Sequence, residues 1–410
     1  MKITFIGFTN IRGGAAKAAV RFQKLLENSG HKALFYSIEN NEKKLPFFNK
    51  ITHRFFWVLS HLLQYNLKSK HSLNIFGSRY IKNKVINAEL LHVHWINNET
   101  LSIRDFKYLS GKSVITLHDE WFYSATEHYN NTEACYKQVV EGYNKQSILQ
   151  GRECLSRFIW KHKKKHYQGL NNVIFTVPSS WLKGRAQQSA LLRDRDIRVL
   201  PNPIDINVFK HDTSNFNIDD LKHDDFVITF GAVDGSANLV KGFDLLLSAL
   251  ELFAASVDLK RKIKIVTFGG KDQHKSSVFG IQSIELGHIY SEAALASIYS
   301  LSSIVIVPSR LESFGQVAAE SLSCETPVLA FNCTGLTDVI IHKKNGYLAN
   351  PFEIESLAEG INWFYQLTNA QLAGLGKAGR AHVTDRFSNE VISKQLVAIY
   401  KELSSENNIA

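Results

Sequence analysis

The chain contains 410 residues, of which 44% are hydrophobic and 21% are charged, so it is long enough to form two domains with separate cores. No apolar run of roughly 18 residues is found, so the sequence predicts no membrane-spanning helix. The net charge of +10 is unevenly divided: residues 1–200 hold 31 Lys and Arg against 14 Asp and Glu (+17), and residues 201–410 hold 17 against 24 (−7). The first half is therefore expected to face a polyanion, either nucleic acid, an anionic membrane surface or a phosphate-bearing lipid acceptor.

The N-terminal segment, the cysteines and one basic cluster bear on the cellular compartment and on the class of binding partner. The first ten residues, MKITFIGFTN, are too short and too polar for a signal peptide and are typical of a first strand. The four cysteines lack the spacing of a metal site, so reduced thiols in the cytoplasm are expected. No nucleic-acid-binding motif is found, so nucleic acid is not expected as a partner. The densest basic cluster predicts either a membrane-facing surface or a solvated helix face; it comprises Lys161, His162, Lys163, Lys164, Lys165 and His166.

The first strand leads into a glycine pair and then a helix over residues 15–31. Gly13 and Gly14 allow close approach of a ligand to the backbone at the start of that helix, although a plain tight turn explains the pair equally well. The dinucleotide fingerprint G-x-G-x-x-G is absent. The apolar segment 55–63 has basic flanks and predicts either a membrane-touching patch or, as we favour, a helix in the core or in an acceptor pocket.

Polar and aromatic side chains follow two further predicted strands. His94 and Trp95 end the segment LLHVHWIN, and His118, Asp119 and Trp121 end the segment SVITLHDEWF. Ligands of parallel α/β sheets bind at the carboxyl ends of the strands, so these residues are expected to form part of a site. Asp119 could orient His118 as a base, although a structural histidine is the simpler explanation. His92, His94, His118 and Asp119 have the side-chain types of zinc ligands, but a zinc site built from them is not expected.

The second half carries the most specific pattern. A predicted strand ends at Pro308, and Glu312 and Glu320 follow it, eight residues apart on a turn and on a helix that begins near Phe314. Eight residues at helical rise span about 12 Å, which is the reach across a diphosphate from one sugar to another. A helix start binds anions, and Lys241 lies at another helix start after a strand. A nucleotide sugar fits this arrangement; two exposed glutamates at a helix start are the alternative.

These motifs resemble the donor-site signature of GT-B glycosyltransferases of family 4, which act with retention. The matching residues are P-S-R-L-E-S-F-G at 308–315, A-A-E-S at 318–321, E-T-P-V at 325–328, Gly335 and N-G-Y-L at 345–348. The segments HWIN, TLHDEW and P-N-P-I-D at 201–205 are similar to a bacterial subgroup that builds capsule, O-antigen and exopolysaccharide. The resemblance covers essentially the whole chain and is strongest over residues 226–350.

The resemblance implies a role for each candidate residue. Glu312 would orient the transferred sugar, Lys241 would stabilise the diphosphate, and His118 would contact the donor sugar or the acceptor. Further donor-binding candidates are Glu320, Ser313, Phe314, Gly315, Gly13, Gly14, Arg310, Gly287 and His288. The acceptor-side candidates are His94, Trp95, Asp119 and Trp121. Many relatives carry an Arg where this chain has Ala232, and Arg310 or Arg12 could replace it.

The expected architecture is α/β with two Rossmann-like doubly wound domains facing a cleft. Residues 1–203 would bind the acceptor, residues 204–385 the nucleotide-sugar donor, and the helix within 386–410 would pack back on the first domain. The expected function is a hexosyltransferase-type glycosyltransferase (EC 2.4), peripheral on the cytoplasmic membrane, acting on a glycan or lipid-linked glycan without cofactor or obligatory metal. The alternatives are a catalytically impaired glycan-binding or scaffold protein and a nucleotide-sugar epimerase.

Overall fold

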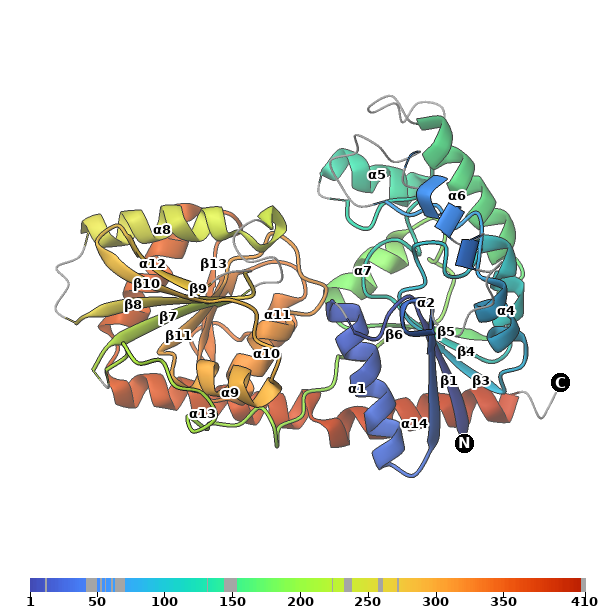
Figure 1. Ribbon diagram of the computed structural model, residues 1–410. Coiled ribbons are helices and arrows are strands. Elements are labelled where there is room, and N and C mark those ends of the chain that lie inside the picture. Colours follow the sequence, from blue (N-terminus) through green and yellow to red (C-terminus); the bar gives the residue numbers. More distant parts are fainter. Residues whose placement is uncertain are drawn as a thin grey trace. The chain divides into compact units, whose positions relative to one another are not determined.

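The computed structural model describes residues 1–11, 13–41, 50–51, 54–55, 57–59, 62, 71–130, 132–143, 153–222, 224–231, 238–256, 261–270 and 273–406 (Figure 1). The predictions for Arg12, for Ala232 and for much of the segment 55–63 lie outside the described residues. The chain divides into two compact units, one formed by Met1–Asn202 with Ile392–Ala410 and the other by Pro203–Val391.

The first unit is built on a parallel sheet with the strand order β2-β1-β3-β4-β5-β6. Its strands are β1 (Lys2–Gly7), β2 (Lys32–Ser37), β3 (Leu90–Val93), β4 (Ser113–Thr116), β5 (Val173–Val177) and β6 (Ile197–Val199). The central strands β3, β4 and β5 are buried along their whole length. Their short, mostly apolar runs suit a parallel sheet, because helices cover both of its faces.

The helices of this unit are α1 (Gly14–Asn28), α2 (Ile38–Asn41), α4 (Arg79–Ile86), η2 (Ile103–Leu109), α5 (Glu133–Glu141), α6 (Glu153–Tyr167), α7 (Ser180–Gln188) and α14 (Asn389–Glu406). The C-terminal helix α14 completes the core of this unit, although it follows the second unit in the sequence (Figure 1). Its Leu396 and Tyr400 belong to the same buried cluster as Phe5 and Phe22. The apolar stripe of α14 is thereby removed from water, which stabilises the helix.

The second unit contains a sheet with the order β13-β12-β11-β7-β8-β10-β9, in which β9 is antiparallel to β10 and lies at the edge. Its strands are β7 (Phe226–Gly231), β8 (Ile263–Phe268), β9 (Gln273–Val278), β10 (Ile281–Leu286), β11 (Ile304–Val307), β12 (Val328–Phe331) and β13 (Gly346–Ala349). Its helices are η4 (Leu239–Lys241), α8 (Phe243–Ser256), α9 (Glu292–Ser300), α10 (Gln316–Ser323), α11 (Leu336–Val339), α12 (Ile354–Gln366) and α13 (Asn369–Phe387).

Strand order fixes where a ligand would bind in each unit. The order reverses between β1 and β3 in the first sheet and between β7 and β11 in the second. In open α/β sheets, the carboxyl ends of the strands at such a reversal border the binding crevice. The prediction of two Rossmann-like doubly wound α/β domains is confirmed. Among the helices that the structure describes, none is both long and apolar enough to cross a membrane.

Candidate functional site

Lys241 and Glu312 meet at the strand-order reversal of the second unit. Lys241 ends η4, which follows β7, and Glu312 lies in the turn that follows β11. The Nζ atom of Lys241 is 2.6 Å from Oε1 of Glu312, and the hydroxyl of Ser309 donates to the same oxygen over 3.0 Å. The two charged side chains keep 28% and 15% of their surface exposed, so a ligand can reach the pair. Tertiary folding thus joins two candidates that stand 71 residues apart.

Close packing of the backbone holds this pair together. Gly242 has a φ of +71°, and a Cβ atom at that position would lie 1.9 Å from the carbonyl oxygen of Pro308. The amide of Arg310 donates to the carbonyl of Val240 over 2.8 Å. Only glycine permits this approach, because it has no Cβ and tolerates positive φ. The absence of a side chain at Gly242 therefore allows η4 to pack directly against the residues that follow β11.

Helix α10 begins beside this pair. Its N-cap Gly315 has a φ of +100° and supplies no side-chain acceptor for the first-turn amides. The first amides of a helix lack partners within the helix and form an anion-binding end. The preceding turn is fixed, since the amide of Gly335 donates to the carbonyl of Glu312 over 2.8 Å. The side chain of Phe314 is 3% exposed and packs edge-on against Phe387, so Phe314 can offer a ligand its backbone only.

Glu320 lies further along α10 and is 4% exposed. Its carboxylate accepts hydrogen bonds from the hydroxyl of Tyr299 over 3.2 Å and from Nε2 of Gln316 over 3.1 Å. Burying a carboxylate is unfavourable in free energy unless hydrogen bonds replace those lost to water. The bonds from Tyr299 and Gln316 supply this compensation and fix the position of the Glu320 carboxylate. The alternative of two exposed glutamates at a helix start is therefore wrong. Tyr299 and Gln316 were not singled out from the sequence, and only folding brings Tyr299 to Glu320.

The remaining donor-side candidates have distinct surroundings. The guanidinium of Arg310 donates to both carboxylate oxygens of Asp244, over 2.8 and 2.6 Å. It also donates to the carbonyl of Leu239 and so stabilises η4. Gly287 follows β10 with a φ of +66°, and its carbonyl accepts from the amide of Gly269. His288 is exposed and stacks on Tyr290, with ring centroids 4.3 Å apart. Their roles towards a donor stay predictions, as does that of Ser313, which is partly exposed.

The glycine pair of the first unit lies where the sequence placed it, between β1 and α1. Gly13 is the N-cap of α1 and has a φ of +87°, whereas Gly14 is the first residue of the helix. Both are exposed, and a Cβ at either would meet no atom within 4 Å. The positive φ at position 13 favours glycine there, whereas at position 14 the absence of a side chain leaves open space at the helix start.

Three histidines lie at the carboxyl ends of β3 and β4: His92 and His94 are buried, and His118 is partly exposed. Nδ1 of His94 is 2.9 Å from Nε2 of His118, and His92 contacts Thr116 and the hydroxyl of Tyr400 over 2.7 and 2.8 Å. Burial lowers the pKa of His92 and His94 well below the ordinary value and that of His118 to about 4. All three are therefore neutral near pH 7. The described residues contain no group of three His, Cys, Asp or Glu side chains that could hold a metal ion.

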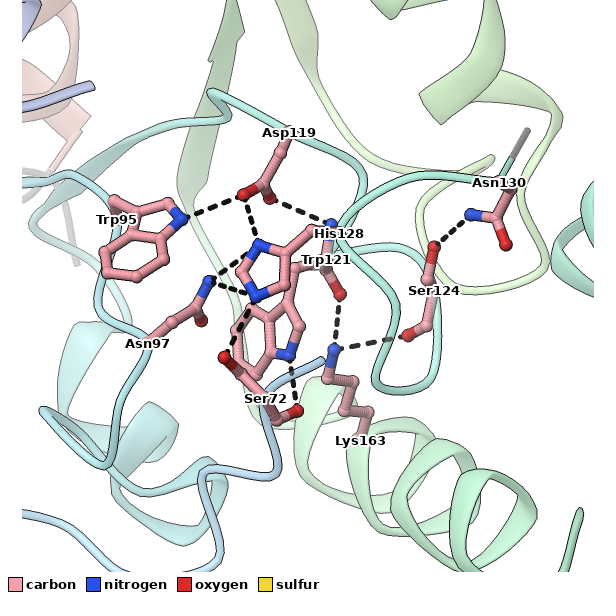
Figure 2. Close-up of polar contacts among 9 residues, drawn as sticks. All are labelled: Ser72, Trp95, Asn97, Asp119, Trp121, Ser124, His128, Asn130 and Lys163. Atoms are coloured by element: carbon pink, nitrogen blue, oxygen red, sulfur yellow. Dashed lines mark hydrogen bonds and ion pairs between the residues drawn. The ribbon is translucent and has the colours of Figure 1, made fainter. Parts of the chain in front are cut away.

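Asp119 has a different partner from the one expected. Its Oδ2 is 2.5 Å from Nδ1 of His128 and accepts from Nε1 of Trp95 over 2.8 Å, and its Oδ1 accepts from the amide of Trp121 (Figure 2). The interpretation that Asp119 orients His118 is corrected accordingly, because the imidazole on this carboxylate is that of His128. Burial disfavours the charged form of Asp119, but the charge and hydrogen bond of His128, with those from Trp121 and Trp95, outweigh burial and lower its pKa.

Two further expectations are overturned by burial. Trp121 is 0% exposed, and its Nε1 donates to the carbonyl of Ser72 over 2.8 Å, so it belongs to the core and cannot contact an acceptor directly. Lys163 is also 0% exposed and does not belong to the basic surface. Its ammonium lies 3.5 Å from the Trp121 ring centroid and donates to the carbonyls of Trp121 and Ser124 (Figure 2). Both residues brace the loop that carries Asp119.

Comparison with known proteins finds similarity to glycosyltransferases. Residues 217–382 match the family described as "Glycosyl transferases group 1". CapM of Staphylococcus aureus, a capsular polysaccharide biosynthesis glycosyltransferase, is 24% identical over 56% of this chain and 61% of its own length. An uncharacterised glycosyltransferase of Methanocaldococcus jannaschii is 33% identical over 43% of this chain and 48% of its own length. The chain thus spans about half the length of the curated relatives that it matches.

Solved structures extend the likeness of fold to the whole chain. Sucrose-phosphate synthase of Thermosynechococcus elongatus superposes with a TM-score of 0.62 at 17% identity, covering 99% of both chains. Anabaena HepE in complex with UDP and glucose gives a TM-score of 0.61 at 18% identity, covering 99% of this chain and 100% of that one. The fold is the two-domain Rossmann-like architecture of GT-B glycosyltransferases.

Proposed function

We propose that the protein is a glycosyltransferase (EC 2.4) that uses a nucleoside diphosphate sugar as donor. The observation that carries the proposal is the Lys241–Glu312 pair at the start of α10, with the buried Glu320 further along the same helix. Cationic and carboxylate groups thus flank an anion-binding helix end, as a sugar diphosphate requires. The match of residues 217–382 to a glycosyltransferase family and the likeness to structures solved with UDP support the same donor class.

The proposed chemistry follows from the charges of the site. The bond between the sugar and the diphosphate breaks, the acceptor hydroxyl oxygen bonds to the sugar, and the hydroxyl proton passes to an oxygen of the departing diphosphate. Negative charge then develops on the departing diphosphate, where Lys241 and the first amides of α10 stabilise it. Glu312 orients the transferred sugar, and Glu320 holds the ribose. Neither a cofactor nor an obligatory metal takes part, and the resemblance to family 4 implies retention of the anomeric configuration.

The biological setting is proposed on a narrower basis. The acceptor would be a glycan or a lipid-linked glycan of a bacterial surface polysaccharide, such as capsule or lipopolysaccharide. Similarity to CapM, named for capsular polysaccharide biosynthesis, supports this setting.

A basic face of the first unit supports docking to the cytoplasmic surface of an anionic membrane. Lys161, Lys164 and Lys165 are exposed on α6, and η2, which packs against α6, adds exposed Arg104 and Lys107. We expect the protein to sediment with phosphatidylcholine vesicles that contain phosphatidylglycerol and to stay in solution with pure phosphatidylcholine. Replacing the three α6 lysines by glutamine should abolish this difference, since each lysine contributes about 1 kcal/mol to the free energy of binding to an anionic membrane. Equal sedimentation of the triple variant would contradict the assignment.

Donor binding is the first test. Thermal unfolding is measured with UDP-, GDP-, ADP- and TDP-sugars for the wild type, for Glu320→Ala and for the control Glu355→Ala, which alters an exposed glutamate on α12. A donor at about a hundred times its dissociation constant should stabilise the wild type and the control by about 2.7 kcal/mol, and Glu320→Ala by much less. No stabilisation by any nucleotide sugar would refute the proposed donor site.

Turnover separates the glycosyltransferase from its two alternatives. A transferase releases nucleoside diphosphate only when an acceptor is supplied, apart from slow hydrolysis. An epimerase changes the sugar and releases no diphosphate. A scaffold on the same fold, which the Ala232 in place of the usual Arg keeps in consideration, binds without either reaction. Analysis of products from the bound donor therefore decides among the three.

A further inference from the structure

A chain of buried hydrogen bonds runs from Ser72 to Trp95 in the first unit. The hydroxyl of Ser72 is 2.9 Å from Nε2 of His128, whose Nδ1 is 2.5 Å from Oδ2 of Asp119. The same oxygen accepts from the indole Nε1 of Trp95 over 2.8 Å (Figure 2). With Nδ1 of His128 donating to the Asp119 carboxylate, Nε2 of the same ring faces the Ser72 hydroxyl, which can donate to that nitrogen or accept from it. The imidazole of His128 thus links Ser72 to the carboxylate that holds the indole of Trp95.

The order serine, histidine, aspartate is also that of a hydrolytic triad, but this chain is not built for nucleophilic attack. Ser72, His128 and Asp119 are 2%, 1% and 7% exposed, so no substrate carbonyl can reach the serine. A nucleophile must be accessible to its substrate within about 3 Å. The surface-facing end of the chain is Trp95, which is partly exposed. What the buried groups accomplish is to fix the position of that indole.

Trp95 lies at the place where a ligand of the first unit is expected. It follows β3, beside the end of β1, at the reversal of strand order, and its carbonyl accepts from the amide of Phe8 over 3.0 Å. The ring of Phe8 meets the indole edge-on with centroids 5.8 Å apart, and the His128 ring lies 5.6 Å away. Backbone, neighbouring rings and the Asp119 hydrogen bond together hold the indole in one orientation. A partly exposed ring fixed in this way binds flat apolar surfaces at little entropic cost.

We propose that Trp95 is the platform on which a pyranose ring of the acceptor stacks, and that His128 is the positioning residue that fixes it through Asp119. The proposal rests on the glycosyltransferase function above and names the acceptor surface of the first unit. A pyranose presents a face of C–H groups that suits an indole ring, while its hydroxyls need polar neighbours. The partly exposed His118, beside the buried His94, lies at the end of the adjacent strand β4 and supplies such a neighbour.

The test is saturation-transfer-difference NMR on the full chain with four probes: the methyl glycosides of glucose, galactose, mannose and N-acetylglucosamine. At least one probe should receive saturation, mainly on the protons of one ring face. Trp95→Ala should weaken binding about tenfold, whereas Trp95→Phe, which keeps an aromatic face, should retain most of it. Trp363→Ala, at a partly buried tryptophan of the second unit, is the matched control and should bind as the wild type does.

The positioning role of His128 has its own signature. His128→Ala should raise the KM for the acceptor about tenfold with a smaller effect on kcat, and His128→Asn, whose amide can still donate to Asp119, should restore most of the loss. A purely structural role would instead lower the melting temperature of both variants alike and leave KM unchanged in the folded fraction. Ser72→Ala, at the far end of the chain, should have a smaller effect than His128→Ala.

The outcomes distinguish this inference from the proposed function. Absence of saturation transfer to every probe in the wild type, or equal transfer in Trp95→Ala, would overturn the platform. Donor-induced stabilisation is measured on the same variants and should be unchanged by Trp95→Ala. A wild type that binds glycosides through Trp95 but no nucleotide sugar would refute the donor assignment while sustaining the platform.

Discussion

Acid should destabilise the first unit through His92, His94 and His118, whose pKa values are lowered by loss of contact with water, and His118 permits a worked magnitude. Burial lowers its pKa from 6.5 to about 4 in the folded state, so the unfolded chain binds the proton more tightly. The stabilisation that the neutral imidazole provides is complete above pH 6.5 and is lost as the pH falls towards 4. Between pH 7 and pH 5, these two pKa values predict that the free energy of unfolding falls by about 2 kcal/mol from His118 alone. His92 and His94, whose pKa values are also lowered by burial, change stability in the same direction.

Urea unfolding at pH 7 and pH 5, followed by tryptophan fluorescence, measures this effect. Five of the six tryptophans belong to the first unit, so the signal reports mainly on its unfolding: Trp57, Trp95, Trp121, Trp160 and Trp181. The variant His118→Gln cannot be protonated, and its loss of stability between the two pH values should be smaller than that of the wild type by about 2 kcal/mol. An equal loss in both proteins would refute the reasoning, because His118 would then not be held neutral by burial.

Three further predictions concern the second unit and the thiols. Lys241→Met should weaken donor binding about 30- to 160-fold in calorimetry, since a charged hydrogen bond contributes about 2–3 kcal/mol; unchanged affinity would exclude Lys241 from the donor site. Gly242→Ala should lower the free energy of unfolding by about 2–4 kcal/mol because its Cβ would meet the Pro308 carbonyl at positive φ. Gly184→Ala, in open space on α7, should be neutral or slightly stabilising in the same denaturation assay, and similar losses in both would contradict the packing argument. Iodoacetamide should modify the partly exposed Cys135 well before Cys324, whose thiol is buried and has a pKa raised mainly by that burial; mass spectrometry of the peptides would show the reverse order if this is incorrect.

The sequence was sufficient to predict the fold class and to single out candidate donor residues that follow strands of the second sheet. Short apolar runs and helical segments alternate along the chain, and that order specifies parallel sheets covered by helices. The end of one strand could be predicted from Pro308, and the glycine pair Gly13 and Gly14 was expected at the start of a helix, where the structure has it. The candidates Lys241 and Glu312 follow two strands that turn out to be neighbours at the reversal of the second sheet.

Tertiary structure decided which side chains meet and which remain accessible. Asp119 and His118 are adjacent in sequence, yet the carboxylate binds His128, because the loop from 119 to 130 folds back over the end of β4. Lys163 belongs to a basic run of the sequence, but its side chain is buried and donates hydrogen bonds to two backbone carbonyls. Buried carbonyls are nearly always hydrogen-bonded in this way. Periodicity along a chain fixes elements, since it depends on neighbouring residues alone. Pairing and burial of side chains depend on loop paths that bring distant segments together, and no local pattern encodes those paths.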